Sequence, residues 1–295
     1  MTDGKRLRAT RVRRCHERAR LGTSAGTAAG TTAGTAGEAA PAIVRPMDLR
    51  TAWLGRIGYR EAWALQKRLV DERADGRSPD TLLLLEHDAV LTLGRQADES
   101  HVLASRRELT RRGIEVIRVE RGGEVTYHGP GQLVAYPILR LGDRSLLVRP
   151  LVRALEQAMI ETCAAAGVAA FRRDGHPGCW VEARPGQSPH KIGALGIRVE
   201  RGVTYHGIAL NVDPDLRDFE LIDACGEPGT ISSSIAEALG RSAEPPTTER
   251  IEAVAWTFAA AFGHQIGAAI DVVDGEALAA TAATGATGAT AAIAG

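Results

Sequence analysis

A cysteine in a glycine- and proline-rich turn is the residue of this chain best suited to nucleophilic chemistry. Cys225 precedes Gly226, and Pro228 and Gly229 follow before a helix expected from Ser232. A turn of this composition can expose a thiol, and the N–H groups at a helix terminus stabilise a thiolate. The pattern indicates Cys225 as a candidate nucleophile. The alternative is a loop cysteine without a chemical role.

A lysine opens a strand of small and apolar residues, Lys-Ile-Gly-Ala-Leu-Gly-Ile-Arg, which runs from Lys191 to Arg198. An ammonium group near a thiol lowers the pKa of the thiol, and the same lysine, once neutral, can accept a proton. Lys191 is therefore the candidate partner of Cys225. The alternative is a solvated lysine at a strand edge, which is the commoner use of lysine there.

Two segments repeat a motif of glycine, tyrosine and histidine. Residues 121–131 read Arg-Gly-Gly-Glu-Val-Thr-Tyr-His-Gly-Pro-Gly, and residues 201–207 read Arg-Gly-Val-Thr-Tyr-His-Gly. Each follows an alternation of apolar and polar residues, which predicts a strand, a tight turn and a second strand. Such turns can bring backbone N–H groups close to a ligand. His128 and His206 occupy matching places, and two roles stay open for them: orienting a reacting carbonyl, or holding the loops by hydrogen bonds.

The other cysteines and the histidines do not point to a metal site. Cys163 falls on the apolar face of an expected helix, Cys179 in a strand and Cys15 in an arginine-rich arm. No C-x-x-C pair or H-x-x-x-H spacing occurs, so no metal is expected. Scattered cysteines suit a reducing cytosol, and a cytoplasmic protein is predicted. The glycine-rich motifs of dinucleotide-binding and P-loop proteins are absent from the sequence.

Composition divides the chain into three parts. The formal net charge is zero, with 36 basic and 36 acidic residues, but the first twenty residues are arginine-rich. Residues 1–46 continue in Gly, Ala, Thr and Ser and are predicted to be disordered; a polyanion contact, a transit-like sequence and a misassigned start are all open readings. Residues 47–275 are expected to form one catalytic domain, and residues 276–295 a low-complexity tail. No transmembrane helix or secretory signal is expected.

The domain should be of the α+β class, because most expected strands are joined by short turns rather than by helices. A mixed, mostly antiparallel sheet with packed helices is predicted. Helices are expected over 59–74, 147–166, 232–239 and 247–261, and strands over 81–85, 89–93, 115–120, 125–128, 133–139, 179–182, 191–199 and 203–212.

Taken together, the motifs resemble one enzyme family over about residues 50–263. They are Leu-Leu-Leu-Leu-Glu-His, Thr-Leu-Gly-Arg at 92–95, the segments from Arg121, Lys191 and Arg201, and Ile-Asp-Ala-Cys-Gly ending at Gly226. In this order they resemble the octanoyl-[acyl-carrier-protein]:protein N-octanoyltransferases of lipoate biosynthesis. One departure is Ala224, where the family more often has proline.

The resemblance implies a biotin/lipoate protein ligase-like fold with Cys225 and Lys191 as the catalytic pair. It also implies three substrate-binding segments. Their residues are Arg121, Gly122, Gly123, Glu124, Val125, Thr126, Tyr127, His128, Ala194, Leu195, Gly196, Gly207, Ile208 and Ala209.

The implied reaction moves an octanoyl, or alternatively a lipoyl, group from acyl carrier protein to a lysine ε-amine through a thioester on Cys225. Its acceptors would be lipoyl domains of 2-oxoacid dehydrogenase E2 subunits and the H protein of glycine cleavage. No cofactor is implied, neither ATP nor metal, because the acyl group arrives activated. A monomer that binds neither membrane nor nucleic acid is expected.

Two other functions remain as alternatives. An ATP-dependent lipoate or biotin protein ligase on the same fold would form an acyl-adenylate and would not need Cys225. An inactive module that binds acyl carrier or nucleic acid is the second alternative, prompted by the basic arm. Both Cys225 and Lys191 are intact, which favours the transferase.

Overall fold

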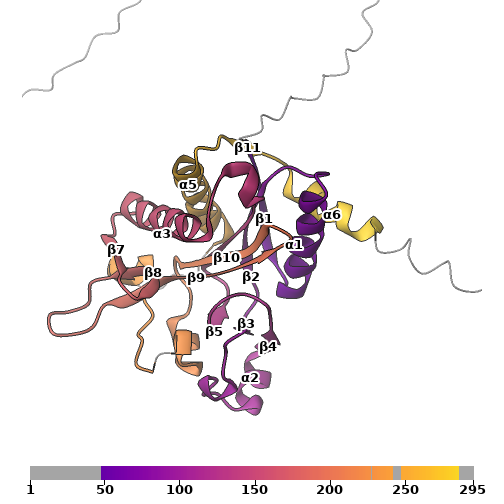
Figure 1. Ribbon diagram of the computed structural model, residues 1–295. Coiled ribbons are helices and arrows are strands. Elements are labelled where there is room, and N and C mark those ends of the chain that lie inside the picture. The colour runs from indigo at the N-terminus through magenta and orange to yellow at the C-terminus, as the bar shows by residue number, and fades with distance from the viewer. Residues whose placement is uncertain (1–47, 227, 242–246, 286–295) are drawn as a thin grey trace, which may run out of the picture. The chain divides into compact units, whose positions relative to one another are not determined.

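Eight strands form one mixed sheet in the computed structural model, which describes residues 48–226, 228–241 and 247–285 (Figure 1). The described residues belong to one compact unit of the chain. The predicted arm over residues 1–46 lies outside them. In spatial order the strands are β11 (Ile270–Val272), β1 (Leu49–Ile57), β2 (Thr81–His87), β6 (Gln132–Ile138), β10 (Val203–Asn211), β9 (His190–Glu200), β8 (His176–Val181) and β7 (Ala170–Arg173).

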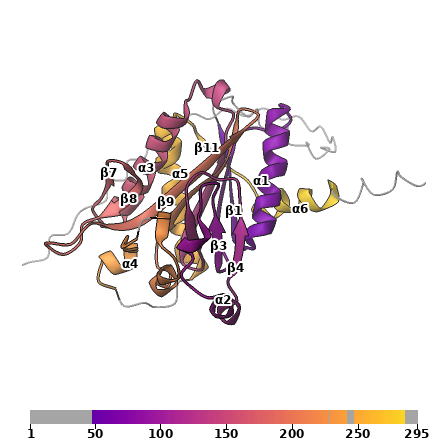
Figure 2. The same ribbon diagram turned by 60° about the horizontal axis from the view of Figure 1, so that its bottom comes forward.

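The sheet is mostly antiparallel, as predicted. Only β1 pairs in parallel, with β2 on one side and β11 on the other. Helices α3 (Val148–Ala165) and α5 (Thr248–Ile266) cover one face, and α1 (Tyr59–Ala74) and α6 (Gly275–Gly285) lie on the other, as both views show (Figures 1 and 2).

Strand β2 explains why the sheet needs helices on both faces. Leu82 and Leu84 pack into the core beneath α3 and α5, while Leu83 and Leu85 pack into the core beneath α1. Successive side chains of a strand point to opposite faces, so a continuous leucine run is stable only where both faces are covered.

A smaller sheet lies beside the main one and carries part of the candidate site. It has the order β4 (Glu115–Arg118), β3 (Val90–Leu93), β5 (Val125–His128). Helix α2 (Arg106–Arg112) and two short 3-10 helices, η1 (Glu99–His101) and η3 (Leu216–Leu221), belong to this region, and a third, η4 (Ala224–Gly226), packs on β5. The end of β4 leads into a turn over residues 121–124, which we call the Arg121 turn. The small sheet therefore presents this turn to the main sheet.

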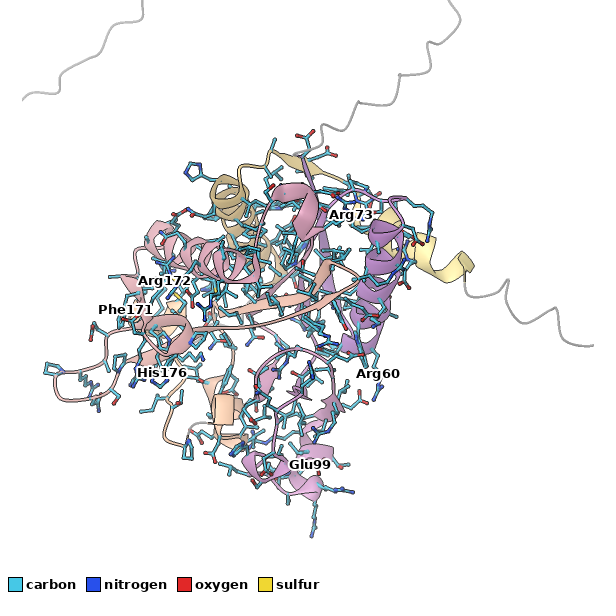
Figure 3. The ribbon with its side chains drawn as sticks, in the orientation of Figure 1. Arg60, Arg73, Glu99, Phe171, Arg172 and His176 are labelled. Carbon is cyan, nitrogen blue, oxygen red and sulfur yellow. The ribbon has the colours of Figure 1, made fainter. Side chains whose placement is uncertain are left out.

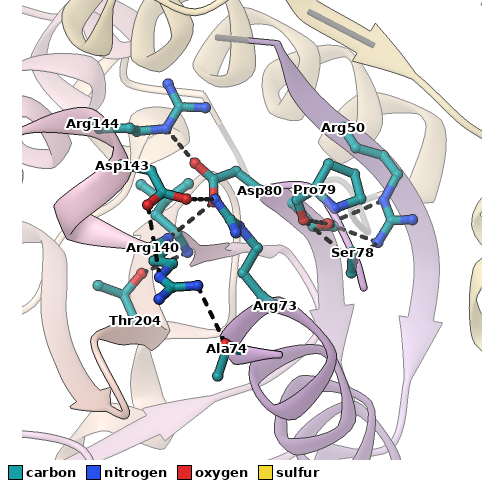
Figure 4. Close-up of polar contacts among 12 residues, drawn as sticks. Arg50, Arg73, Ala74, Ser78, Pro79, Asp80, Arg140, Asp143, Arg144 and Thr204 are labelled. Carbon is teal, nitrogen blue, oxygen red and sulfur yellow. Dashed lines mark hydrogen bonds and ion pairs between the residues drawn. The ribbon is translucent and has the colours of Figure 1, made fainter. Parts of the chain in front are cut away.

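An ion cluster around Asp80 joins three elements on the main sheet (Figure 4). The buried Asp80 carboxylate accepts hydrogen bonds from Arg73 Nε at 2.6 Å, from the backbone N–H of Arg140 at 2.9 Å and from Arg144 Nε. Arg73 belongs to α1 and Arg144 to the 3-10 helix η2 (Leu141–Arg144). The cluster therefore ties the end of α1 to the start of β2 and to the connection before α3.

The predicted elements are present, with corrections at their ends. The helix predicted over 232–239 is the short α4 (Ile235–Ala238), because Ser234 is its N-cap and Ser232 instead bridges to Lys191. The helix predicted over 247–261 runs on to Ile266, where Gly267 ends it in a left-handed conformation. Strands β1, β7 and β11 and helix α2 were not predicted. Helix α6 occupies residues assigned to the low-complexity tail, of which residues 286–295 lie outside the described part.

Candidate active site

A cavity of about 260 Å³ lies where the Arg121 turn and β5 meet β9 and β10 of the main sheet. Most of the sequence-predicted substrate-binding residues line it. These are Arg121, Gly123, Glu124, Val125, Thr126, His128, Ala194, Leu195, Gly196, Gly207, Ile208 and Ala209, together with Lys191.

Lys191 is held by two backbone hydrogen bonds and by the packing of its side chain against Trp180. Its backbone N–H donates to Ile231 O at 2.8 Å and its carbonyl accepts from the N–H of Ser233 at 2.9 Å. The register between β8 and β9 shifts beside it, between Cys179 and Trp180. Bulges of this kind re-aim side chains next to active sites. The side chain is 9% exposed, and Nζ lies 5.1 Å from the centre of the Trp180 ring.

The backbone under Lys191 requires glycine at position 178. Gly178 has φ +135°, and a Cβ there would lie 2.5 Å from Gly193 O and 2.9 Å from Lys191 Cε. Buried Glu156 of α3 accepts the N–H of Gly178 at 3.1 Å, and its other oxygen accepts from Arg172 at 3.2 Å. Helix α3 thus anchors the β7–β8 hairpin, where Figure 3 shows Arg172 and His176.

The backbone of Cys225 lies in η4, which packs beside β5. Ala224, immediately before it, is buried and lines a second, small cavity together with Lys191, Thr126 and Ser232. The Cys225 turn and Lys191 are more than thirty residues apart in sequence. The fold brings the two segments to one cavity wall.

The Arg121 side chain holds the neighbouring turn in place and is not open to bind an anion. Its guanidinium is buried and donates to Thr92 O at 2.6 Å, to Thr92 Oγ1 at 2.9 Å and to Gly122 O at 3.1 Å. The N–H of Gly122 donates to Ile197 O at 3.1 Å. These contacts fix the glycine turn between β3 and β9.

The turn approaches β9 so closely that a side chain at Gly196 has no room. A Cβ at this position would lie 2.6 Å from Gly122 O. The small residue is therefore required by the approach of two backbones, which is the behaviour that the glycine motifs predicted.

The histidines at the site are neutral and their orientation is partly fixed. His128 Nδ1 lies 2.8 Å from Gln132 Oε1, and Gln132 Nε2 contacts Asn211 Oδ1 at 2.9 Å, so the amide oxygen faces the ring. Because an amide oxygen only accepts, Nδ1 carries the proton and Nε2 is an acceptor. Desolvation by burial holds the pKa of His128 well below its usual value, and the positive charge of Arg121 lowers it further.

His206, the counterpart of His128, also lines the cavity but is bonded differently. It is 1% exposed, takes the left-handed conformation with φ +56°, and its backbone N–H donates to Gln66 Oε1 at 2.7 Å. Burial lowers the pKa of His206 to about 3. Burial therefore favours the neutral form of both histidines, and the hydrogen bond of His128 to Gln132 favours the loop-holding role for that residue.

Two of the sequence-predicted residues do not line the cavity. Tyr127 points to the other side of β5, where its hydroxyl donates to Asp218 Oδ2 at 2.7 Å, and Gly122 is covered by β9. Alternation along a strand accounts for Tyr127, since its neighbours Thr126 and His128 do line the cavity.

The cavity also has walls that sequence reasoning missed. Tyr59 at the start of α1, Gln96 after β3, Tyr136 in β6, and His176 and Pro177 on the β7–β8 hairpin complete the lining. Tyr136 donates from its hydroxyl to His87 Nε2, 2.8 Å away, because His87 Nδ1 faces Ile57 O at 2.9 Å. No local motif marks these residues, because each arrives from a different element.

Within the residues that the structure describes, no group of three or more histidine, cysteine or acidic side chains is placed to hold a metal ion. Over the same ranges, none of the helices is long and apolar enough to span a membrane.

Comparison with known proteins places the chain in a family. The family model described as the lipoyl protein ligase A/B catalytic domain matches residues 58–255. The octanoyltransferase of Acidobacterium capsulatum is 46% identical over 230 residues, covering 75% of this chain and 92% of its own. The octanoyltransferase of Chloroflexus aggregans is 47% identical over 197 residues, covering 66% of this chain and 86% of its own.

Solved structures share the fold. A lipoate-protein ligase A bound with ATP has a TM-score of 0.60 at 17% identity, over 80% of this chain and 94% of that one. A putative lipoate protein ligase of T. acidophilum with bound lipoic acid has a TM-score of 0.57 at 15% identity, over the same shares of the two chains. At such low identity these structures confirm the predicted ligase-like fold and nothing more.

The chain belongs to the lipoyl protein ligase A/B catalytic-domain family. Within that family, the predicted membership of the octanoyltransferases is confirmed, and the protein is an acyltransferase.

Proposed function

We propose that the protein transfers an octanoyl group from octanoyl-acyl carrier protein to the lysine ε-amine of a lipoyl domain, through a thioester on Cys225. The observation that carries the proposal is the shared cavity wall of Lys191 and Ala224, which puts a buried lysine beside the turn that bears Cys225. An apolar cavity adjoins this wall, as an acyl chain requires.

In the first step the Cys225 thiolate attacks the carbonyl carbon of the donor thioester. A new carbon–sulfur bond forms, the bond to the carrier's sulfur breaks, and the acyl group stays on Cys225. The carrier's thiolate takes up the proton of the Lys191 ammonium, which leaves Lys191 neutral for the second step. Exchange of one thioester for another changes the bond energy little, so a covalent intermediate divides the transfer into two easier steps.

In the second step the acceptor amine attacks the thioester carbonyl on Cys225. The amine must be neutral to attack, and neutral Lys191 takes up the proton that it releases as the amide forms. The Cys225 thiolate leaves and is ready for the next donor. The ammonium form of Lys191 then stabilises that thiolate by Coulomb attraction.

Backbone N–H groups near the glycine turn would stabilise the oxyanion of both steps, at roughly 3 to 4 kcal/mol per donor. The N–H of Gly122 is excluded from this role because it already donates to Ile197 O.

The octanoyl tail would lie against Val125, Leu195, Ile208 and Ala209, which line the cavity. Burial contributes about 0.8 kcal/mol per CH₂, so the length of the cavity selects the chain length. Its volume of about 260 Å³ lies near the lower end of ordinary small-molecule sites.

The proposal includes neither ATP nor metal, because the thioester donor is already activated. The acceptors are lipoyl domains, among them those of 2-oxoacid dehydrogenase E2 subunits and the glycine cleavage H protein. We propose a cytosolic reaction, which the scattered cysteines of the chain support because they suit a reducing compartment.

An ATP-free transfer assay tests the reaction. The protein is mixed with octanoyl-acyl carrier protein and an unmodified lipoyl domain, and the mass of the lipoyl domain is followed. We expect octanoylation without ATP, and its loss in Lys191→Ala. Modification that needs free octanoate and ATP would instead identify a ligase, the second candidate on this fold.

A further inference from the structure

A groove on the far side of the small sheet belongs to no part of the proposed mechanism. It has a volume of about 560 Å³ and lies between α2, β4 and the segment over 99–104. Its floor is apolar and formed by Leu93, Val102, Ala104, Leu109, Ile114 and Val116. We call this groove and its rim the α2 surface; Glu99, labelled in Figure 3, lies on it beside α2.

Two large apolar side chains are exposed on the elements that border the groove. Leu103, in the segment over 99–104, is 58% exposed, and Val116, which lines the groove from β4, is 42% exposed. Exposed apolar groups beside a groove with a polar rim are typical of a protein-binding site.

The rim has an excess of positive charge. Its acidic groups are already paired: Glu99 with Arg118 at 3.1 Å, and Glu108 with Arg112 at 2.6 Å. Asp98 caps η1 by accepting the N–H of Ser100.

Three other arginines on and beside the rim are not paired with any described acidic group. Arg106, Arg107 and Arg95 are exposed, and within the described ranges none of them forms an ion pair. Arg106 and Arg107 open α2, and Arg95 adjoins Gln96 at the wall of the catalytic cavity. Arginines thus stand both at the groove and beside the cavity, and this positive charge suits an acidic partner.

The α2 surface is joined directly to the Cys225 turn. The N–H groups of Leu103 and Ala104 donate to Leu221 O at 2.9 and 3.1 Å, and the N–H of Asp223 donates to His101 O at 2.8 Å. Val102 forms an antiparallel bridge with Ile222. A partner seated on Leu103 therefore rests on the segment that supports Cys225.

We propose that the α2 surface docks the protein that delivers the acyl thioester, through an acidic face of that protein. This inference rests on the proposed function. The donor is favoured over the acceptor because the α2 surface is bonded to the Cys225 turn, the segment that takes up the acyl group in the first step. The acceptor amine must also meet Lys191, which lies on β9 on the other side of the Cys225 turn.

The test separates the two half-reactions. Arg106→Glu/Arg107→Glu and Leu103→Ser are compared with wild type in single-turnover acylation of Cys225, from octanoyl-acyl carrier protein and from octanoyl-pantetheine. Arg149→Glu is the matched control, because Arg149 is an exposed arginine on α3 that forms no ion pair with any of the described residues. Transfer from pre-acylated enzyme to a lipoyl domain is measured separately.

We expect the double variant to raise the KM for octanoyl-acyl carrier protein about tenfold, with a weaker salt dependence. Acylation by octanoyl-pantetheine and transfer to the lipoyl domain should not change. Unchanged acylation by the carrier, an equal loss with both donors, or a loss confined to transfer would overturn the docking proposal. A wild-type chain that accepts octanoyl from neither donor would instead overturn the proposed function, and the docking proposal with it.

Discussion

Lys191 Nζ lies 5.1 Å from the centre of the Trp180 ring, so the candidate catalytic lysine rests beside an aromatic ring that is itself almost fully buried. The ring is fixed by a hydrogen bond from Trp180 Nε1 to His176 O at 3.0 Å. Arg173 Cζ also lies 5.1 Å from the same ring centre. We therefore expect Trp180 to act on the reaction through the position of Lys191.

Replacing this ring should slow acyl transfer without weakening donor binding. A desolvated cation–π contact contributes up to about 2 kcal/mol, so Trp180→Leu should lower kcat roughly tenfold. Trp180→Phe keeps a ring and should recover most of the rate. The pH dependence of Cys225 alkylation by iodoacetamide should shift to higher pH in Trp180→Leu, because the Lys191 ammonium is no longer held in position. An unshifted profile, or equal losses in both variants, would show that Trp180 only supports the fold.

A methyl group at Gly196 should displace one wall of the site. Its Cβ would meet Gly122 O at 2.6 Å, so the Arg121 turn must move away from β9. Overpacking of this kind costs about 1 to 3 kcal/mol. We expect Gly196→Ala to lower the stability by that amount and to raise the KM for the octanoyl donor. Gly142→Ala is the matched control, because a Cβ there meets nothing within 4 Å; equal behaviour of the two variants would contradict the proposed close approach.

Buried neutral histidines should make the protein less stable in mild acid. Burial lowers the pKa of His206 to about 3 and that of His87 to about 4, from 6.5. As the pH falls, these histidines therefore bind protons in the unfolded chain while they stay neutral in the folded chain. The stabilisation is complete above pH 6.5 and is lost as the pH falls toward the folded-state values. Each histidine should contribute a loss of about 2 kcal/mol between pH 7 and pH 5.

Urea unfolding at the two pH values measures this loss. His206→Asn removes one titrating ring and keeps a residue that tolerates the left-handed conformation. The variant should lose about 2 kcal/mol less than wild type over the same interval. An identical pH dependence in wild type and variant would mean that His206 is protonated in the folded chain.

The Asp80 cluster should be a stability determinant with little effect on chemistry. Asp80→Ala leaves Arg73 and Arg144 without their buried partner. Breaking a buried pair from one side costs about 3 to 5 kcal/mol. We expect a loss of that size in urea unfolding, with transfer activity retained in the fraction that stays folded. A loss below 1 kcal/mol would indicate that solvent reaches the cluster.

The elements that sequence analysis predicted are those whose own residues bury a periodic face. Leu151, Leu155 and Met159 follow one another at intervals of four and are all fully buried on α3. Helix α2 was missed because Leu109 is its only buried residue among four arginines, so it has no apolar stripe. Strand β1 was missed because its buried pattern is irregular, and β11 because it is only three residues long.

The same distinction applies to the site. Lys191 and the Arg121 segment stand in motifs that can be found locally, and their convergence on one cavity followed from the family resemblance. Tyr59, Tyr136 and His176 reach the cavity from three separate elements, and only the three-dimensional fold shows that they meet. The contact of Trp180 with Lys191 likewise depends on a register shift between β8 and β9, which no local pattern marks.

The central claim is the thioester on Cys225, and intact mass spectrometry tests it most directly. The reduced protein is incubated with octanoyl-acyl carrier protein, without acceptor and without ATP. The account predicts a single octanoyl adduct that hydroxylamine removes and that Cys225→Ser does not form. A folded, reduced wild-type protein that gains no adduct, or a Cys225→Ser variant that gains the same one, would contradict it.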